Sequence, residues 1–310
     1  MQSEVDTNNH KKGVHPIVIA LIPAHNEARY IGSVVLQAHK YVDTVIVVDD
    51  GSTDATGEIA EAAGAVVIRH EHNLGKGAAL NTGFNEVRKL SPHVVVILDA
   101  DGQHQAQEIP EVVRPVLEGK ADMAVGSRFL GIRNRISPLR AFGMRALTAA
   151  TNLSSGVPLS DSQTGFRAFS RESLADMNFW SHGFSVESEM QFLARELGLK
   201  IAEVPISVNY ADAPKRNIFA QGLEVLNGIL RLIGQHRPLL FFGAPGLMML
   251  LFGLWWGYHV VEIYRQTQEL AIGYALLAVL LCIVGSVILS TGITLHTLRA
   301  LLLELVRKQE

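Results

Sequence analysis

Short apolar runs alternate with longer amphipathic segments from Pro16 to about Lys200. The short runs predict strands at residues 17–22, 44–48, 66–69, 94–98 and 123–125, and the longer segments predict helices at residues 28–40, 55–63, 76–89 and 106–118. The strands are apolar along their whole length, so we expect helices to cover both faces of the sheet. This alternation is typical of the α/β class with a mostly parallel sheet, and about 200 residues suffice for one such domain.

A different pattern begins at residue 217. Apolar residues recur there at three- and four-residue spacing, which places them on one face of a helix: Phe219, Leu223, Leu226, Leu230 and Ile233. Since residues 217–237 lead directly into an uncharged run, we expect this helix to lie on a membrane surface. Packing of the same face against the α/β domain is the alternative that the pattern leaves open.

Two uncharged runs follow, at residues 238–261 and 270–298. With 24 and 29 residues, they exceed the about 20 residues that cross a bilayer as a helix. The polar residues 262–269 join them, so the sequence predicts a transmembrane hairpin whose two ends emerge on the same side. These two runs account for most of the low charged fraction, 18%, of the 310-residue chain.

Basic residues gather around the open end of this hairpin, at Arg231, Arg237, Arg299, Arg307 and Lys308. The connection between the spans carries only Arg265. Because short cytoplasmic segments are enriched in Lys and Arg, we expect a cell-membrane protein with residues 15–216 and the tail 299–310 in the cytoplasm.

The remaining composition excludes several classes of protein. A net charge of −3 gives no electrostatic support to nucleic-acid binding. The single cysteine, Cys282, excludes an intrachain disulfide framework. Residues 1–14 are polar, lack the apolar core of a signal peptide, and are predicted to form a flexible lead.

Three polar clusters follow predicted strands directly. They are residues 23–27 (Pro-Ala-His-Asn-Glu), 49–54 (Asp-Asp-Gly-Ser-Thr-Asp) and 99–104 (Asp-Ala-Asp-Gly-Gln-His). In open parallel sheets, ligands bind at the carboxyl ends of the strands. Because these ends share one edge of the sheet, we expect the three clusters to form one site.

The third cluster carries the sharpest chemical signal. Asp99 and Asp101 leave a strand two residues apart, and a divalent cation such as Mg²⁺ or Mn²⁺, which prefers oxygen ligands, would offset their repulsion. Gln103 offers a further amide oxygen, and His104 a further ligand. A simple turn at the strand end is the structural alternative for an isolated Asp-x-Asp, but the two neighbouring clusters favour a metal site.

The other clusters carry weaker signals. Asp50 is a candidate partner for ribose hydroxyls or a base. Asn26 and Glu27 either contact a ligand or cap the following helix. Lys76 lies between glycines at a helix start, as in phosphate-binding loops, although the full spacing of a P-loop is missing.

Further motifs complete a known pattern. They are Gly126-Ser127-Arg128, Asp-Ser-Gln-Thr-Gly-Phe-Arg at residues 161–167, Gly-Phe-Ser-Val-Glu-Ser-Glu at residues 183–189 and Val-Pro-Ile at residues 204–206. Together with the three clusters, they resemble glycosyltransferase family 2 over residues 16–215, which implies a GT-A fold that binds a nucleotide sugar. With the C-terminal hairpin, the chain is most similar to the dolichyl- and polyprenyl-phosphate sugar transferases. The resemblance implies transfer of a sugar from a UDP- or GDP-sugar to a polyprenyl or dolichyl phosphate.

The resemblance and the residue chemistry together suggest four groups of site residues. At the nucleotide sugar we expect Pro23, Ala24, Asn26, Glu27, Asp50, Lys76 and Asp99. At the divalent cation, Mg²⁺ or Mn²⁺, we expect Asp99, Asp101 and Gln103. At the acceptor phosphate we expect Arg128, Arg140, Arg145, Arg167, Lys215 and Arg216. The expected catalytic residues are Asp99, Asp101, Arg128 and Asp161.

One basic stretch of the family pattern is missing, and three carboxylates have no assigned role as a base. Relatives often carry an Arg-x-x-Gly-x-Ser-Lys stretch after the Val-Pro-Ile strand, and residues 210–217 here do not match it. Lys215 or Arg216 is the expected replacement for that basic contact. Asp161, Glu187 and Glu189 are expected to orient arginines or sugar hydroxyls, and none is assigned as a base.

The chemistry of a phosphate acceptor fits these residues. A phosphate monoester is anionic near neutral pH, so it can attack the anomeric carbon without a strong general base. Arginines position such a group through paired N–H donors. We therefore expect the sugar to be transferred in a single displacement that inverts the anomeric configuration. We also expect residues 138–153, which carry Arg140 and Arg145, to rest at the membrane surface.

Other functions fit the sequence less well. The nearest alternative is a family 2 enzyme that acts on another membrane-associated acceptor, such as a lipid-linked oligosaccharide or a glycolipid. A processive polysaccharide synthase usually carries Gln-x-x-Arg-Trp, and no Trp of this chain follows an Arg. Residues 23–27 match neither the Gly-rich basic loop of nucleotidyltransferases nor the Gly-x-Gly-x-x-Gly of dehydrogenases. A membrane-anchored scaffold with a lapsed site is the non-enzymatic alternative.

Overall fold

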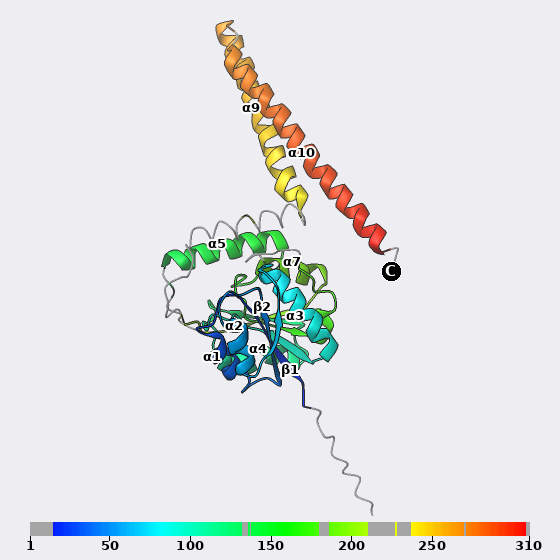
Figure 1. Ribbon diagram of the computed structural model, residues 1–310. Coiled ribbons are helices and arrows are strands. Elements are labelled where there is room, and N and C mark those ends of the chain that lie inside the picture. The colour runs from blue at the N-terminus through cyan, green and yellow to red at the C-terminus, as the bar shows by residue number, and fades with distance from the viewer. Residues whose placement is uncertain are drawn as a thin grey trace, which may run out of the picture. The chain divides into compact units, whose positions relative to one another are not determined.

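The computed structural model of the chain divides into two compact units (Figure 1). The α/β unit comprises Met1–Thr148 and Pro158–Ile218, and the hairpin unit comprises Ala149–Val157 and Phe219–Glu310. The structure describes residues 15–131, 136, 138–179, 186–209, 227, 237–269 and 271–307.

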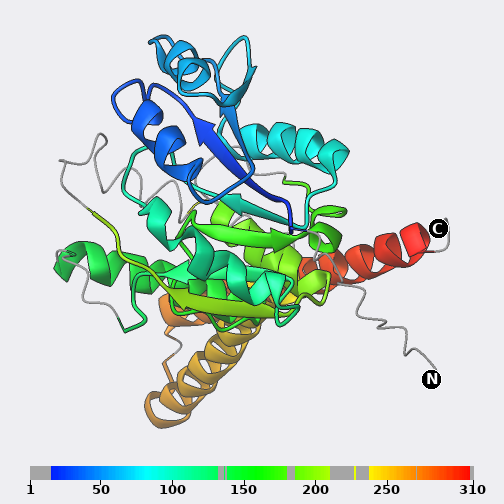
Figure 2. The same cartoon turned by 90° about the horizontal axis from the view of Figure 1, so that it is seen from below.

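The described residues of the α/β unit form a seven-stranded sheet (Figure 2). Its strands are β1 (Val18–Ala24), β2 (Thr44–Asp49), β3 (Val66–Arg69), β4 (Val94–Ile97), β5 (Met123–Ser127), β6 (Arg167–Ser170) and β7 (Ile201–Pro205). They lie in the order β3-β2-β1-β4-β6-β5-β7. β6 is antiparallel to β4 and β5, and the other pairs are parallel, so the prediction of a mostly parallel sheet is confirmed.

Helices cover both faces of this sheet. One face carries α1 (Ile31–Ala38), α2 (Thr56–Ala62), the 3-10 turn η1 (Ala106–Glu108) and α4 (Ile109–Leu117), since α1 contacts α2 and η1. The other face carries α3 (Lys76–Leu90) and α6 (Arg171–Leu174), which contact each other. The unit also contains α7 (Val186–Glu196), whereas α5 (Pro138–Ser155) continues into the hairpin unit.

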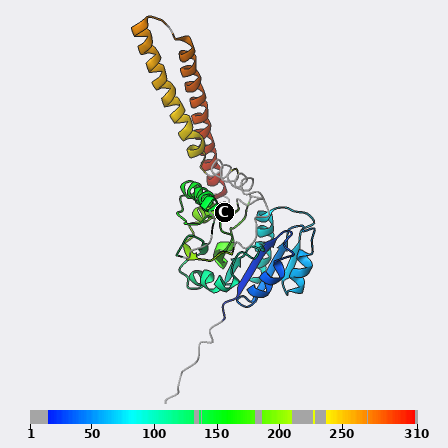
Figure 3. The ribbon, with the colours of Figure 1, turned by 90° about the vertical axis from the view of Figure 1, so that its left-hand side faces the viewer.

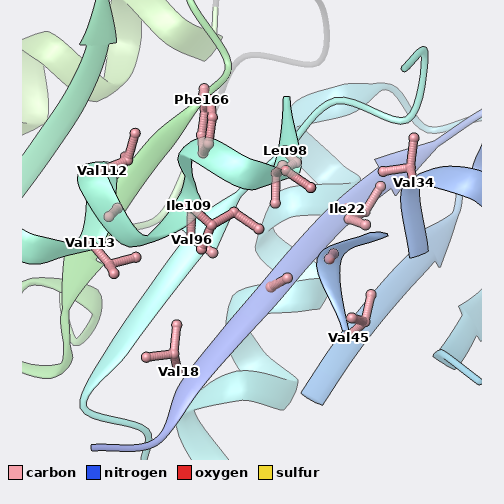
Figure 4. Packing of buried hydrophobic residues seen from close by; sticks show 14 of the residues in the cluster. Val18, Ile22, Val34, Val45, Val96, Leu98, Ile109, Val112, Val113 and Phe166 are labelled. Carbon is pink, nitrogen blue, oxygen red and sulfur yellow. The ribbon is translucent and has the colours of Figure 1, made fainter. Parts of the chain in front are cut away.

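Successive residues of the central strands point to opposite faces, and both faces are buried. Ile22 belongs to one buried cluster with Val34 of α1 and Val112 of α4 (Figure 4). Leu21 serves the other face, where a Cβ on Gly83 of α3 would lie 2.3 Å from a Leu21 methyl carbon. The absence of a side chain at Gly83 therefore allows α3 to pack closely against β1.

The predicted elements of the α/β unit omit β6, α5, α6 and α7, and the first predicted helix begins too early. β6 is four residues long and directly follows a polar motif, so its pattern predicted no strand. The first helix begins at Ile31 rather than at residue 28, because Asn26 adopts a φ of +55° and residues 28–30 turn before the helix begins.

Two antiparallel helices dominate the described part of the hairpin unit (Figure 3). A π-helical turn, η2 (Leu239–Gly243), leads into α9 (Ala244–Thr267), and α10 (Ile272–Arg307) follows. A Cβ on Gly246 would lie 2.4 Å from the Leu289 nitrogen, and a Cβ on Gly285 would lie 2.6 Å from the Leu250 nitrogen. These glycines therefore let the two backbones approach each other closely.

The helices support the predicted transmembrane hairpin. Leu239–Thr267 and Ile272–Leu298 are long and apolar enough to span a membrane. The connection is shorter than the predicted 262–269, because α9 continues through Glu262 to Thr267. α10 also continues through much of the predicted tail 299–310, to Arg307. The predicted amphipathic helix 217–237 lies outside the described residues apart from residues 227 and 237, and it stays a prediction.

Candidate active site

The carboxyl ends of three parallel strands bring the polar clusters to one edge of the sheet. Pro23 and Ala24 end β1, and Ala24 is in register with Asp49 at the end of β2. The backbone N–H of Leu98, just after β4, donates to the Leu21 carbonyl at 3.1 Å. The three clusters therefore lie side by side, as expected from the topology of a parallel sheet.

Hydrogen bonds lock the first cluster to the second. The Asn26 backbone N–H donates to Ser52 Oγ at 2.9 Å, and Asn26 Oδ1 accepts the Thr53 N–H at 2.8 Å. The Glu27 N–H donates to Thr56 Oγ1 at 2.8 Å. Asn26 and Glu27 thus shape the loop between β1 and α1, and their contact with a nucleotide stays a prediction.

Asp50 is buried, and both of its carboxylate oxygens are engaged. Oδ1 accepts from the Leu74 N–H at 2.9 Å and from His70 Nδ1 at 2.7 Å, and Oδ2 accepts the Gly75 N–H at 2.8 Å. His70 Nε2 lies 3.0 Å from Thr82 Oγ1 on α3. Since a carboxylate only accepts, His70 Nδ1 carries the proton and Nε2 accepts from Thr82 when the ring is neutral. Asp50 thereby anchors the loop that leads into α3, and its contact with a ribose or base stays a prediction.

Lys76, the first residue of α3, bridges two carboxylates. Its Nζ lies 2.6 Å from Asp99 Oδ1 and 2.6 Å from Glu187 Oε1 on α7. Burial of the ammonium lowers the pKa of Lys76, but the two carboxylates outweigh that effect and raise it above its ordinary value. Glu187 Oε2 is buried and has no hydrogen-bond partner among the described residues. Lys76, Asp99 and Glu187 thus form a charged cluster in which one carboxylate oxygen has no hydrogen-bond partner among the described residues.

Asp99 and Asp101 have unequal electrostatic surroundings. Burial raises the pKa of Asp99, but the nearby Lys76 ammonium, which also donates a hydrogen bond, more than offsets it and lowers the pKa to about 2. Burial and the charge of Asp99 raise the pKa of Asp101, although the Gln103 N–H donates to Asp101 Oδ1 at 3.0 Å. Among the described residues, Asp101 therefore has no cationic partner comparable to the Lys76 of Asp99, and a bound cation would supply one.

The residues present fit a divalent cation. Asp99 and Asp101 offer hard carboxylate oxygens, which Mg²⁺ and Mn²⁺ prefer. A Cβ on Gly165 would lie 2.6 Å from both carboxylate oxygens of Asp99, so only glycine leaves this carboxylate its place. Within the described ranges, no group of three His, Cys, Asp or Glu side chains makes a complete metal site. Mg²⁺ sites of one or two carboxylates completed by substrate phosphates and water have this character.

His104 packs behind the loop. Burial of the His104 ring lowers its pKa, so the ring is neutral near pH 7. Its Nδ1 accepts the Asp99 N–H at 3.4 Å, and its ring centroid lies 5.2 Å from that of Phe166. Nδ1 therefore holds the loop backbone, while a role of His104 as a further ligand stays a prediction.

Arg128 directly follows β5 and pairs with Asp161. Its Nε lies 2.6 Å from Asp161 Oδ2, and its Nη2 lies 2.7 Å from Oδ1. The Arg128 backbone N–H also donates to Oδ2 at 3.1 Å. Asp161 is fully buried, and such a two-pronged pair fixes the plane of a guanidinium. Orientation of an arginine is one of the two roles expected for Asp161.

Arg167, the first residue of β6, is directed into the protein interior beneath the loop that precedes it. The side chain is fully buried, with Nε donating to the Thr164 carbonyl at 3.0 Å and Nη2 to the Ser162 carbonyl at 2.7 Å. Burial lowers the pKa of Arg167 to about 10, so it is still charged at neutral pH. Nε and Nη2 thus support the loop at residues 161–165, whereas Nη1 is buried and has no hydrogen-bond partner among the described residues. Contact of Arg167 with an acceptor phosphate stays a prediction.

The other arginines expected at the acceptor lie on α5 or outside the described residues. Arg145 is exposed, and its guanidinium carbon lies 5.1 Å from the ring centroid of Phe129. Arg140 lies on the same helix and is partly buried. Lys215 and Arg216 lie outside the described residues. The phosphate contacts of all four residues stay predictions.

Sequence reasoning missed the role of His70 and the partner of Lys76. His70 directly follows β3 at the same edge as the three clusters, and that position was the available signal. Lys76 and Glu187 are 111 residues apart, so no local pattern could pair them.

Comparisons with known proteins agree with this geometry. A model of glycosyl transferase family 2 matches residues 19–177. The chain is 32% identical over 235 residues to the UDP-N-acetylglucosamine–dolichyl-phosphate N-acetylglucosaminyltransferase of Methanococcus voltae, covering 68% of this chain and 92% of that protein. It is 30% identical over 202 residues to the polyprenol monophosphomannose synthase of Mycolicibacterium smegmatis, covering 61% of this chain and 76% of that protein.

A solved structure shares the fold of the α/β unit. The crystal structure of glucosyl-3-phosphoglycerate synthase from Mycobacterium tuberculosis, in complex with Mg²⁺ and uridine diphosphate, matches with a TM-score of 0.58 and 27% sequence identity. The match covers 71% of this chain and 80% of that chain. The resemblance found in the sequence is thus confirmed, and the chain belongs to glycosyl transferase family 2.

Proposed function

We propose that this glycosyltransferase moves a sugar from a nucleotide-diphosphate sugar to a polyprenyl or dolichyl phosphate. One observation carries the proposal: the same chain holds the acidic loop of Asp99 and Asp101 and two helices able to span a membrane. A lipid-linked acceptor explains why a site for sugar transfer, located at the carboxyl ends of the strands, is attached to such a hairpin. The relatives from Methanococcus voltae and Mycolicibacterium smegmatis, named for dolichyl phosphate and polyprenol monophosphomannose, support this acceptor class.

A divalent cation is part of the proposal. Asp99, Asp101 and Gln103 would hold Mg²⁺ or Mn²⁺. When bound, such a cation supplies positive charge for the departing nucleotide diphosphate. Structures of the Mycobacterium tuberculosis synthase with Mg²⁺ or Mn²⁺ and uridine diphosphate support this assignment. Both UDP- and GDP-sugars fit the proposal, with Pro23, Ala24, Asn26, Glu27 and Asp50 at the nucleotide.

The acceptor phosphate is the nucleophile in this proposal. Its oxygen forms a bond to the anomeric carbon as the bond from that carbon to the nucleotide diphosphate breaks, which inverts the configuration. No general base is needed, because a phosphate monoester is already anionic near neutral pH. Arg128, held in one plane by Asp161, would bind the phosphate, and Lys76 keeps Asp99 ionised.

The proposal includes a cellular location. Basic residues flank the open end of the hairpin, whereas Arg265 alone lies near its closed end. This asymmetry supports a multi-pass protein of the cell membrane with the α/β unit and the C-terminus on the cytoplasmic side.

The test is a substrate screen on the full-length protein in lipid vesicles. UDP- and GDP-sugars are offered one at a time with polyprenyl phosphate and Mg²⁺ or Mn²⁺, and lipid products are identified by mass spectrometry. We expect one lipid-monophosphate sugar, formed by the unaltered protein and lost in Asp101→Asn. Glu61→Gln, which changes a carboxylate that is 56% exposed and pairs with Arg69, is the matched control and should retain activity.

Two results would overturn the acceptor assignment. Sugar transfer to a glycolipid or a lipid-linked oligosaccharide, but never to polyprenyl phosphate, would favour a different membrane-associated acceptor. Failure of every nucleotide sugar to bind in a calorimeter would favour a scaffold with a lapsed site.

A further inference from the structure

His70 links Asp50 to helix α3, and the three residues Asp50, His70 and Thr82 form a relay. His70 Nδ1 lies 2.7 Å from Asp50 Oδ1, and His70 Nε2 lies 3.0 Å from Thr82 Oγ1. The side chains of His70 and Asp50 are only 10% and 5% exposed. Hydrogen bonds in such surroundings are stronger than in water. Neither His70 nor Thr82 has a role in the proposed function.

The sheet and α3 hold the two ends of the relay in place. The His70 N–H donates to the Asp49 carbonyl at 2.9 Å, which extends the pairing of β3 with β2 by one residue. Thr82 lies within α3 next to Gly83, which packs closely against Leu21 of β1. The strands therefore fix the backbone of His70, and the helix fixes the hydroxyl that the His70 ring contacts.

The relay determines which oxygen of Asp50 is open to a further hydrogen bond. A carboxylate has about four acceptor positions, two on each oxygen. Oδ1 accepts from the Leu74 N–H and from His70 Nδ1, whereas Oδ2 accepts only from the Gly75 N–H among the described residues. One position, on Oδ2, is therefore left for a donor that no described residue supplies.

The loop before α3 does not need His70 as an anchor. The neighbouring N–H groups of Leu74 and Gly75 already bind the two oxygens of the carboxylate, one each. A Cβ on Gly51 would lie 2.3 Å from the His72 carbonyl carbon, so the loop also packs closely against the turn after β2. The hydrogen bond from His70 comes from a different element, and it restricts the rotation of the carboxylate.

From these observations we infer that His70 is a positioning residue for the nucleotide. It holds Asp50 so that the open acceptor position on Oδ2 meets an N–H or O–H donor of the nucleoside. Thr82 supports His70 in this role, because its hydroxyl donates to Nε2 and thereby keeps the proton of the neutral ring on Nδ1. The inference rests on the proposed function only in the binding of a nucleotide sugar, and it does not depend on the acceptor.

The first test measures nucleotide binding without any need for transfer. The full-length protein in detergent is titrated with UDP and with GDP in a calorimeter, in the presence of Mg²⁺, and the Kd of the tighter nucleotide is compared between variants. His70→Ala should raise this Kd about tenfold, the effect expected when a hydrogen bond to a charged group is lost. His70→Asn should restore most of the affinity, since its amide can donate to Asp50 in place of Nδ1, whereas His70→Gln should not.

A second histidine provides the matched control. His39 follows α1, and its Nε2 lies 3.2 Å from the Gly64 carbonyl, away from the relay. His39→Ala should leave the Kd for the nucleotide unchanged.

A double-mutant cycle tests the part played by Thr82 and keeps His70 in place. Thr82→Val removes the hydroxyl and keeps the shape of the side chain, so it should raise the Kd about threefold. In the His70→Asn background, which has no Nε2, the same change should have no further effect. Thr82→Ser, which keeps the hydroxyl, should bind like the unaltered protein. An equal effect of Thr82→Val in both backgrounds would overturn the relay, because Thr82 would then act without His70.

Transfer kinetics supply a readout that a general loss of stability would not produce. His70→Ala should raise the KM for the nucleotide sugar and leave kcat little changed, because Asp50 is expected to contact a part of the donor that does not react. A lower kcat with an unaltered KM would overturn the positioning role.

The outcomes separate this inference from the proposed function. An unchanged Kd in His70→Ala, or equal losses of affinity in His70→Ala and His70→Asn, would overturn the inference. A loss of affinity in His70→Ala that is recovered in His70→Asn, without transfer to any prenyl phosphate, would leave the inference in place and refute the proposed acceptor.

Discussion

The α/β unit and the hairpin unit bury opposite kinds of residue. The α/β unit encloses charged side chains within an aliphatic core, among them Asp50, Asp161, Arg167 and Glu187. The described helices of the hairpin enclose mainly small residues, such as Gly246 and Gly253, and leave large apolar side chains exposed. The difference follows from the surroundings: water covers the first unit, whereas lipid is expected to cover the second.

Glycine shows the difference most clearly. In the α/β unit, Gly165 leaves space for the carboxylate of Asp99. In the hairpin, Gly285 leaves space for the backbone of the neighbouring helix. Glycine therefore makes room for a carboxylate of the candidate active site in one unit and for close helix packing in the other.

Removal of Lys76 is the strongest way to break the charge balance of the α/β unit. Lys76→Met leaves the Asp99 and Glu187 carboxylates without their shared cation, so we expect the free energy of unfolding to fall by about 3–5 kcal/mol. Thermal or denaturant unfolding measures the change. Lys120→Met, at a lysine that is 73% exposed, is the control and should change stability little.

A double variant tests the reason for this loss. Adding Glu187→Gln to Lys76→Met removes one of the two unpaired charges, so part of the stability should return. If the double variant is no more stable than Lys76→Met, uncompensated charge is not the cause.

Gly165→Ala should reduce activity with a smaller effect on stability. The added Cβ would displace the Asp99 carboxylate, and a shift of about 1 Å in an active site can cost about 10²-fold in rate. The measurement is the transfer rate as a function of Mn²⁺ concentration. Gly143→Ala, where nothing lies within 4 Å of the added Cβ, is the control, and equal rates in the two variants would contradict the role of Gly165.

Gly285→Leu should weaken the hairpin and leave the sugar-transfer site intact. Overpacking against Leu250 costs about 1–3 kcal/mol. Unfolding of the helices in detergent, followed by circular dichroism, should show the loss, while nucleotide-sugar binding stays unchanged. Gly273→Leu, with open space around the added side chain, is the matched control. A loss of nucleotide-sugar binding in Gly285→Leu would show that the two units are not independent in this respect.

Ser52→Ala should have the smallest effect. It removes the acceptor of the Asn26 N–H, a loss of about 1 kcal/mol for one hydrogen bond. The expected signs are a slightly lower unfolding midpoint and a modest rise in KM for the nucleotide sugar. A change in kcat with KM unaltered would contradict a role of this bond in shaping the nucleotide loop.

The class of fold, the edge of the sheet that carries the site and the hairpin were all predictable from the amino-acid sequence. Apolar runs identify the buried strands from local sequence alone. Because ligands bind at the carboxyl ends of parallel strands, Asp50, Asp99 and Asp101 were then expected at one edge of the sheet. The two uncharged runs are long enough to predict spans from length and charge alone.

Which side chains meet within the site depends on the packing of segments that are distant in the sequence. The antiparallel insertion of β6 between β4 and β5 brings Gly165 against Asp99 and buries Arg167 beneath the loop at residues 161–165. Glu187, near the start of α7, gives Lys76 its second carboxylate from a position 111 residues away. These contacts depend on packing between distant segments, and the residue types at each position are compatible with several partners until the fold selects one.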